Sequence, residues 1–125
     1  TGRRRRPGWL DLVMLRHAAR LNSLTEIALT KLDILDTFDT VRVCIGYELD
    51  GNEISGYPDN PNLLQKVRPK FIDLPGWKKP VNAIRNYVDL PRPAKALVEL
   101  VEKHVGVPVT MIGVGPERNE CVVRK

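Results

Sequence analysis

The sequence is poor in cysteine, and its two cysteines, Cys44 and Cys121, lie far apart in the chain. They form no CxxC pair and show no Cys/His spacing, which argues against a metal site and leaves a disulfide framework unsupported. No apolar stretch approaches the roughly 18–20 residues that a helix needs to cross a bilayer, and the arginine-rich opening has no apolar signal-peptide region. We therefore expect a cytoplasmic protein with no membrane partner, in which both thiols are buried structural residues.

Catalytic motifs are also missing. The GxxxxGK[ST] pattern of a phosphate loop does not occur. Neither histidine is a strong candidate for a catalytic base. His17 lies on an apolar helical face and is interpreted as a core residue, whereas His104 ends a predicted helix, where a positive charge suits the helix dipole. The sequence thus predicts no catalytic residue and no metal ligand in this segment.

The chain has 125 residues, a formal net charge of +5 and a pI of about 9.5. This length allows one domain with a modest core, so residues 1–125 are interpreted as a single segment. The positive charge favours anionic partners, namely nucleotides, nucleic acid or acidic metabolites. A chain that opens on Thr1, inside a motif, looks truncated.

Hydrophobic periodicity and turn residues predict an α/β fold. Helix, strand, helix and strand in alternation favour parallel strands joined by crossover connections. Asp50-Gly51 marks a tight turn, from which residues 53–55 return as the second arm of a β-hairpin. The other predicted elements are helices at 9–21 and 91–104, strands at 27–30, 41–47 and 107–112, a short turn or helical piece at 33–38, and a long excursion at 56–90 with little regular structure apart from a short extended piece at 70–74.

The predicted helix 9–21 is apolar on two sides. Val13 and Leu21 fall on one side at helical spacing, and Leu12 and Ala19 fall on nearly the opposite side. Such a helix needs cover on both sides, and a chain of this length has little material to supply it. A larger body is therefore expected around this helix.

Lys31 and Asp33 follow the predicted strand 27–30, at a strand end of the kind where α/β sheets bind ligands. Guanine presents N1–H and the exocyclic amine as adjacent donors, and one carboxylate can accept both. Adenine has no donor there, so the carboxylate would remain buried and unpaired against it. The stem of Lys31 can lie along the base plane. The alternative is that Asp33 caps the following turn and Lys31 is solvated.

Four consecutive arginines, Arg3–Arg6, follow Gly2 at the start of the chain. Arginine forks bind carboxylate and phosphate oxygens in pairs, and a glycine allows backbone N–H groups to approach a ligand. The alternatives are a solvated basic run or a nonspecific nucleic-acid arm. Aromatic residues make up 6% of the chain, and only Trp9 lies near this run, which weakens the second alternative.

Gly113-Val114-Gly115-Pro116 follows the predicted strand 107–112. Backbone without Cβ atoms can approach a flat base closely and flank it. An ordinary turn at the end of a strand is the alternative interpretation of this motif.

Five segments stand in one order along the chain: Thr1-Gly2-Arg3-Arg4-Arg5-Arg6-Pro7-Gly8-Trp9-Leu10-Asp11, Leu29-Thr30-Lys31-Leu32-Asp33-Ile34-Leu35-Asp36, Leu74-Pro75-Gly76-Trp77, Gly106-Val107-Pro108 and Gly113-Val114-Gly115-Pro116. Together they resemble the C-terminal part of the adenylosuccinate synthetase family, over essentially the whole chain. The resemblance implies part of a mostly parallel-sheet fold like that of the P-loop NTPases.

That family joins IMP to L-aspartate, with GTP hydrolysis, to give adenylosuccinate, GDP and phosphate, the committed step from IMP to AMP. The resemblance implies that Arg3 also touches IMP and that Arg5 faces the GTP phosphates. The L-aspartate loop implied by the resemblance comprises Thr1, Gly2, Arg3, Arg4 and Arg5, and the guanine contacts comprise Lys31, Leu32, Asp33, Gly113, Val114 and Gly115.

The family's catalytic aspartate and histidine, its phosphate loop and its Mg²⁺ ligand lie in an N-terminal portion whose motifs do not occur here. The resemblance therefore implies a C-terminal fragment that supplies one side of the active site and is inactive alone. The full enzyme is expected to be a Mg²⁺-dependent homodimer that takes GTP, IMP and L-aspartate and binds no nucleic acid. The alternative function is a small basic nucleic-acid-binding domain that uses the Arg3–Arg6 arm.

Overall fold

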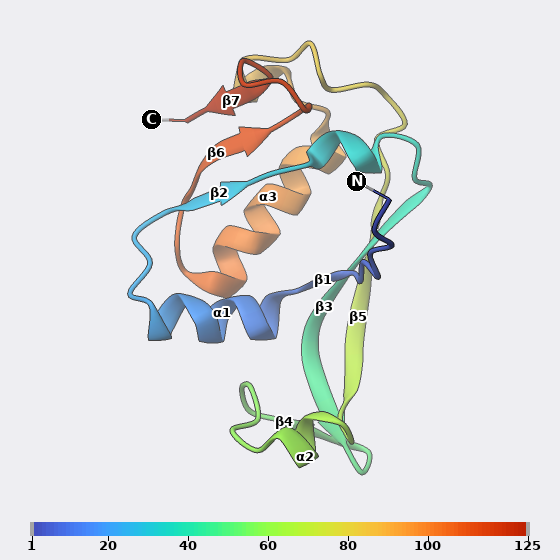
Figure 1. Cartoon of the computed structure of the whole chain (residues 1–125), viewed down its shortest axis with the longest axis vertical. Coiled ribbons are helices and arrows are strands. Elements are labelled where there is room, and N and C mark those ends of the chain that lie inside the picture. The colour runs from blue at the N-terminus through green and yellow to red at the C-terminus, as the bar shows by residue number, and fades with distance from the viewer. Residues whose placement is uncertain (1, 125) are drawn as a thin grey trace.

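The computed structural model of the chain describes residues 2–124, which form two small sheets around one long helix. Figure 1 shows the helix α3 (Arg92–Val105) beside the sheet of β2, β6 and β7, while the β3–β5 pair extends away from it and carries β4 and α2 at its far end. None of the helices in this part of the chain has the length and apolar character of a membrane span.

The first sheet is built on β3 (Thr40–Leu49). Its side chains alternate between exposed and buried from Thr40 to Val43, as the sequence predicted, but a register shift between Cys44 and Gly46 ends the alternation. β5 (Arg68–Pro75) pairs antiparallel along almost the whole of β3. The short strands β1 (Leu10–Asp11) and β4 (Asn52–Ile54) therefore share the opposite edge, the first parallel to β3 and the second antiparallel. The predicted hairpin between β3 and β4 is confirmed: Asp50 and Gly51 have φ values of 52° and 81°, the left-handed geometry of a tight two-residue turn.

The second sheet has the order β2-β6-β7. β2 (Ile27–Leu29) and β6 (Val109–Gly113) pair in parallel, joined by a long connection that contains α3, so the predicted parallel crossover pairing is confirmed. β7 (Cys121–Val123) returns antiparallel to β6. The carboxyl ends of β2 and β6 consequently lie at the same edge of this sheet.

The predicted helix 91–104 is present as α3, and its residues bury the predicted apolar stripe. Pro91 precedes its first turn, and Gly106 ends it with φ of 76°, a conformation that glycine adopts without strain. Each fully buried valine or leucine of the stripe contributes about 1.5–3 kcal/mol to folding. The buried core around α3 includes Leu12, Ala19, Val41, Val43, Trp77, Val81, Ala94, Leu97, Val98, Val101, Val109, Ile112, Val114 and Val122.

The helix α1 (Leu12–Leu21) lies between this core and a smaller one. Leu12 and Ala19 join the core around α3, whereas Val13 packs into a second cluster with Cys44 and Tyr47. The chain itself thus covers part of both apolar sides of this helix, and the larger body expected around it stays a prediction. The remaining apolar side chains of α1 stay exposed, among them Met14 (50%) and Leu21 (72%).

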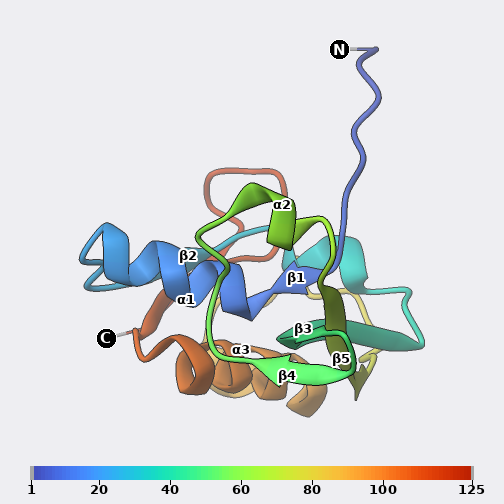
Figure 2. The ribbon, with the colours of Figure 1, turned by 90° about the horizontal axis from the view of Figure 1, so that it is seen from below.

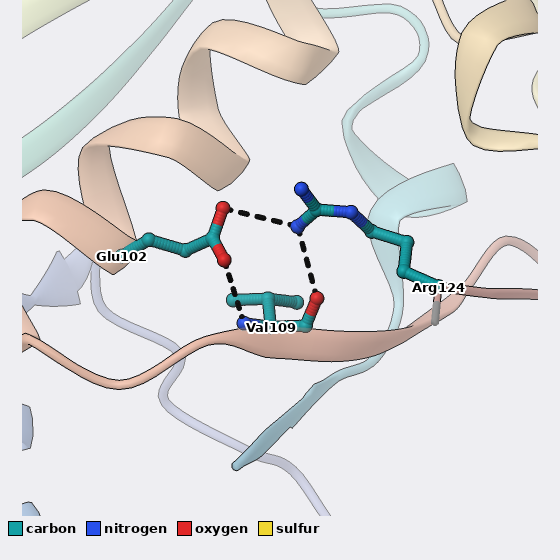
Figure 3. A network of polar contacts seen from close by, with 3 residues as sticks. All are labelled: Glu102, Val109 and Arg124. Atoms are coloured by element: carbon teal, nitrogen blue, oxygen red, sulfur yellow. Dashed lines mark hydrogen bonds and ion pairs between the residues drawn. The ribbon is translucent and has the colours of Figure 1, made fainter.

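The end of the described chain is tied to α3 by one arginine (Figure 3). An η nitrogen of Arg124 lies 3.0 Å from a carboxylate oxygen of Glu102 and donates to the carbonyl of Val109, also at 3.0 Å. The other carboxylate oxygen of Glu102 accepts the N–H of Val109 at 3.0 Å. The guanidinium carbon of Arg124 also lies 4.1 Å from the ring centroid of Tyr87. This network fixes α3 against the start of β6 and the strand that follows it.

Several predicted boundaries and environments are wrong. Residues 9–11 are not helical, because Leu10 and Asp11 pair with β3 and the carboxylate of Asp11 caps α1, accepting the N–H groups of Val13 and Met14 at 3.0 Å. His17 is half-buried and not a core residue, since its ring stacks on that of Tyr57 with centroids 4.9 Å apart.

Two further corrections concern cysteine burial and sheet pairing. Cys44 is buried as predicted, whereas Cys121 is only partly buried on the outermost strand, β7. The sheets are mixed and not mostly parallel, because β4, β5 and β7 all pair antiparallel.

The predicted excursion at 56–90 is irregular over much of its length, and its predicted extended piece at 70–74 is confirmed as part of the longer strand β5. β5 forms an eight-residue strand because it finds a partner along β3, a contact that local sequence does not report. The other short elements of this part of the fold are the helix α2 (Pro61–Leu64), the 3₁₀ turn η1 (Leu32–Leu35) and the 3₁₀ turn η2 (Tyr87–Asp89).

Candidate functional site

The strand ends of β2 and β6 bring together the two segments expected to hold a base. Leu29 pairs with Ile112, so the residues that follow each strand emerge side by side. A Cβ atom built on Gly113 would lie 3.3 Å from Cα of Thr30 and 3.6 Å from the nitrogen of Lys31. The backbone of Gly113 therefore packs directly against the start of the Lys31–Asp33 segment.

The Lys31–Asp33 segment changes direction sharply as it leaves β2. Lys31 has φ of 64° and ψ of 36°, a left-handed conformation that is uncommon for a residue with a side chain. Leu32 follows as a core residue that is 2% exposed, and it anchors the first turn of η1. This anchor leaves Lys31 exposed on one side and Asp33 half-buried on the other.

Asp33 does not cap the turn, so that part of the alternative is not borne out, whereas Lys31 is exposed, as the alternative also expected. Lys31 occupies the capping position of η1, and no side chain caps it. Within residues 2–124, the carboxylate of Asp33 takes part in no hydrogen bond or ion pair. Its oxygens are thus available to accept donors from a ligand.

The glycine motif after β6 presents backbone, not side chains. Val114 is fully buried, and its N–H already donates to the carbonyl of Glu120 at 2.9 Å. A Cβ atom on Gly115 would overlap the carboxylate of Glu120, which also accepts the N–H of Glu117 at 2.9 Å. Close packing therefore favours glycine at positions 113 and 115, and these two residues can offer a ligand only their main chain.

The arginine run is not brought into contact with this strand edge. Thr1 lies outside the described residues, and Gly2 has φ of 70°, which suits its predicted permissive role. Arg3, Arg4 and Arg5 are exposed and form no hydrogen bond or ion pair with any described residue. Figure 2 shows this part of the chain standing away from the molecule. Like charges in sequence repel one another, and no acidic partner faces them here.

The arginine run is followed by a well-anchored segment of chain at β1. Tyr47 on β3 donates a hydrogen bond from its hydroxyl to the carboxylate of Asp11, whose other oxygen caps α1. Burial, together with this hydrogen bond, raises the pKa of Tyr47 above its ordinary value. The hinge between the arginine run and the fold is thereby fixed by β1, although the run itself is not.

A hollow of about 300 Å³ is lined by residues of both segments. Trp9 comes from the segment after the arginine run, and Thr30, Lys31 and Ile34 come from the end of β2 and the turn after it. The ring of Trp9 also meets that of Phe38 edge-on, with centroids 5.8 Å apart. The sequence analysis assigned Trp9 to a helix and missed this position. The preceding Pro7-Gly8 pair is the signal that a helix does not yet begin there.

No metal centre is evident among the described residues. Within residues 2–124, no three side chains of His, Cys, Asp or Glu gather so that they could hold a metal ion. The groups that this strand edge can offer a ligand are therefore the free carboxylate of Asp33, the exposed ammonium of Lys31 and the backbone of the glycine motif. The arginine run belongs to a separate, exposed segment.

Comparisons with known proteins agree with the resemblance. The family model described as adenylosuccinate synthetase matches residues 1–122. Adenylosuccinate synthetase of the fungus Phaeosphaeria nodorum is 48% identical over 124 residues, which are 99% of this chain and 29% of the relative. The enzyme of the bacterium Alkaliphilus metalliredigens is 45% identical over 125 residues, or 100% of this chain and 29% of the relative.

A solved structure agrees as well. Fully ligated adenylosuccinate synthetase from Plasmodium falciparum matches with a TM-score of 0.90 and 31% sequence identity, over 94% of this chain and 29% of that one. The chain thus spans just under a third of the length of the relatives that it matches. These matches give no support to the alternative of a small nucleic-acid-binding domain. The chain belongs to the adenylosuccinate synthetase family.

Proposed function

We propose that this chain is the C-terminal nucleotide- and aspartate-binding part of an adenylosuccinate synthetase. The parent enzyme would join IMP and L-aspartate with hydrolysis of GTP, a ligation in AMP biosynthesis. The observation that carries the proposal is the close approach of the Lys31–Asp33 segment to Gly113, in a chain that shares its family with synthetases along its whole length.

Guanine recognition is assigned to the edge formed by β2 and β6. The free carboxylate of Asp33 accepts N1–H and the exocyclic amine of guanine in a bidentate pair. The stem of Lys31 lies along the base, and the backbone of Gly113 and Gly115 flanks it where no Cβ intervenes. Leu32 and Val114 act through their buried side chains, which hold these backbones in place.

Substrate anions are assigned to the arginine run. Arg3 and Arg4 pair with the carboxylates of L-aspartate, and Arg3 also reaches IMP, while Arg5 faces the GTP phosphates. Each guanidinium offers a planar fork that matches carboxylate or phosphate oxygens. These side chains are exposed, and β1 anchors the segment that carries them. This supports the role, because the arginines are free to close onto a ligand.

The acid/base chemistry is assigned to the remainder of the parent enzyme. There GTP phosphorylates the 6-oxygen of IMP, and the aspartate amine then displaces that phosphate. Mg²⁺ is expected from the family, but the residues described here do not fit a magnesium site, so no step is assigned to it in this segment.

We also propose a P-loop-NTPase-like parent fold and a homodimer. A cytosolic setting is supported by the free thiols of Cys44 and Cys121.

The direct test uses the full-length protein that carries this segment. Adenylosuccinate formation is followed with IMP, L-aspartate and Mg²⁺, and with GTP or ATP in turn. The proposal predicts turnover with GTP and little with ATP, whereas the isolated chain is expected to be silent. Equal use of ATP, or no ligation by the intact protein, would contradict the assignment.

A further inference from the structure

The Leu74-Pro75-Gly76-Trp77 segment has no role in the site described so far, yet its tryptophan is bound to the turn that carries Asp33. Trp77 is 5% exposed, and its indole nitrogen donates to one carboxylate oxygen of Asp36 at 2.7 Å. The other oxygen of Asp36 accepts the N–H of Val81 at 3.2 Å. Both carboxylate oxygens of Asp36 thus accept hydrogen bonds from a loop that lies some forty residues away in the sequence.

Asp36 also closes the turn that Asp33 opens. The N–H of Asp36 donates to the carbonyl of Asp33 at 3.1 Å, which is the hydrogen bond that defines the end of η1. Asp33 is therefore joined to Trp77 through a single residue. A shift of the Asp36 side chain moves the backbone to which the Asp33 carboxylate is attached.

Gly76 holds the same stretch at a second point. Its N–H donates to the carbonyl of Asp39 at 2.8 Å, and a Cβ atom at this position would overlap the carbonyl of Phe38. The 36–39 stretch is consequently clamped by both Gly76 and Trp77. At the other end of the turn, Gly113 packs on Thr30, so the Asp33 turn is held from both sides.

We propose that Asp36 and Trp77 are positioning residues for guanine recognition. The inference rests on the proposed function, because it concerns the same Asp33 carboxylate. Bidentate pairing with a base edge requires the carboxylate to be held within about 0.5 Å and 10–20° of its productive geometry. The partly buried Trp77–Asp36 hydrogen bond supplies that restraint from outside the site, without touching the nucleotide.

The test is Trp77→Phe in the full-length protein, which keeps an aromatic ring in the core and removes the indole N–H. Kinetics are measured with GTP and with ITP, which lacks the 2-amino group that Asp33 is proposed to read. We expect the preference for GTP over ITP, as a ratio of kcat/KM values, to fall about 3- to 10-fold, the effect of one weakened hydrogen bond. KM values for IMP and L-aspartate should be unchanged.

A general loss of stability is separated from positioning by Val98→Ala, which opens a cavity at a fully buried residue of α3 and removes no hydrogen bond from the turn. It should lower Tm and leave the GTP/ITP preference intact. Asp36→Asn is the second variant, since its amide retains one acceptor for Trp77 but turns a donor toward Val81. It should reproduce part of the loss. If both Trp77→Phe and Asp36→Asn lower Tm with an unchanged preference, the positioning role is overturned.

A double-mutant cycle tests whether the two residues act together. Trp77→Phe combined with Asp36→Ala should lose no more GTP/ITP preference than the more severe single variant, because Asp36→Ala already removes the hydrogen bond that Trp77→Phe removes, together with the one to Val81. Additive losses would overturn the proposal. Asp33→Asn is the reference variant: if it reduces the preference while Trp77→Phe does not, only the positioning role fails. If Asp33→Asn leaves the preference unchanged, both the positioning role and the guanine assignment fail.

Discussion

Gly113 packs against Thr30 so closely that a Cβ atom on the glycine would lie 3.3 Å from the Thr30 Cα atom. This contact joins the ends of two strands that are some eighty residues apart in sequence. Since Lys31 and Asp33 follow Thr30 directly, the packing at Gly113 sets how the proposed guanine-binding turn leaves the sheet. This packing predicts that a methyl group added at Gly113 changes both the free energy of unfolding and the KM for GTP.

Gly113→Ala is expected to lower the free energy of unfolding by about 1 kcal/mol, because the added carbon presses on backbone that cannot rotate away. KM for GTP should rise more than KM for IMP. Gly8→Ala is the matched control, since a Cβ atom on Gly8 would have no atom within 4 Å and its φ is not positive. Urea unfolding and steady-state kinetics of the full-length protein measure both effects. Equal behaviour of the two alanine variants would contradict the packing argument.

Glu102→Ala is expected to destabilise the protein by about 1–3 kcal/mol. The N–H of Val109 and the guanidinium of Arg124 both lose their acceptor, in a setting where the ion pair is only partly exposed. Glu99→Ala, an exposed change on the same helix, should cost less than 0.5 kcal/mol, roughly the limit for surface changes. Denaturant unfolding compares the pair. Similar losses for both would show that the network in Figure 3 adds no stability.

Tyr47→Phe tests the pH dependence of the Asp11 contact. The folded-state pKa of Tyr47 is raised above 10.0, so its stabilising contribution is complete below pH 10. Above pH 10 the unfolded chain ionises first, and the contribution is lost as pH rises through the folded pKa. The stability difference between wild type and Tyr47→Phe should therefore narrow above pH 10, by at most about 1.4 kcal/mol per pH unit. A constant difference across this range would contradict the raised pKa.

Arg3→Leu should act on ligands and not on folding. The side chain is exposed and bonds to no described residue, so Tm should change by less than about 2 °C, as for a neutral surface substitution. KM for L-aspartate or IMP should rise, because a paired guanidinium is lost from a carboxylate or phosphate. Calorimetry and steady-state kinetics decide the matter. A large fall in Tm with normal kinetics would give Arg3 a structural role instead.

The sequence predicted the elements whose pattern is local. The stripe of α3 and the turn at Asp50-Gly51 are each determined by neighbouring residues, and each is confirmed. The alternation along β3 is confirmed only from Thr40 to Val43, because a register shift follows. β1 was missed, and β5 was predicted only as a short extended piece at 70–74, because both strands exist through pairing with β3. Pro69 within β5 also reads as a strand breaker, although an edge strand tolerates it where no N–H is required.

The candidate site likewise has a part that could be predicted from the sequence and a part that could not. The Lys31–Asp33 segment and the glycine motif could be selected from residue types and strand ends, and parallel pairing of β2 with β6 brings them together. The restraints on that turn could not be foreseen. The Trp77–Asp36 hydrogen bond spans 41 positions, and no periodicity or spacing reports such a contact. The roles of Arg3, Arg4 and Arg5 stay predictions, since these side chains meet no described partner.

The most direct measurement is the nucleotide preference of Asp33→Asn in the full-length protein. XTP carries a 2-oxo group where GTP has an amine, so an amide at position 33 can accept N1–H and donate to that oxygen. We predict that kcat/KM for GTP falls by about 1–3 kcal/mol in transition-state stabilisation while kcat/KM for XTP rises, which shifts the preference from GTP toward XTP. Unchanged GTP kinetics, with XTP still rejected, would remove Asp33 from the nucleotide site.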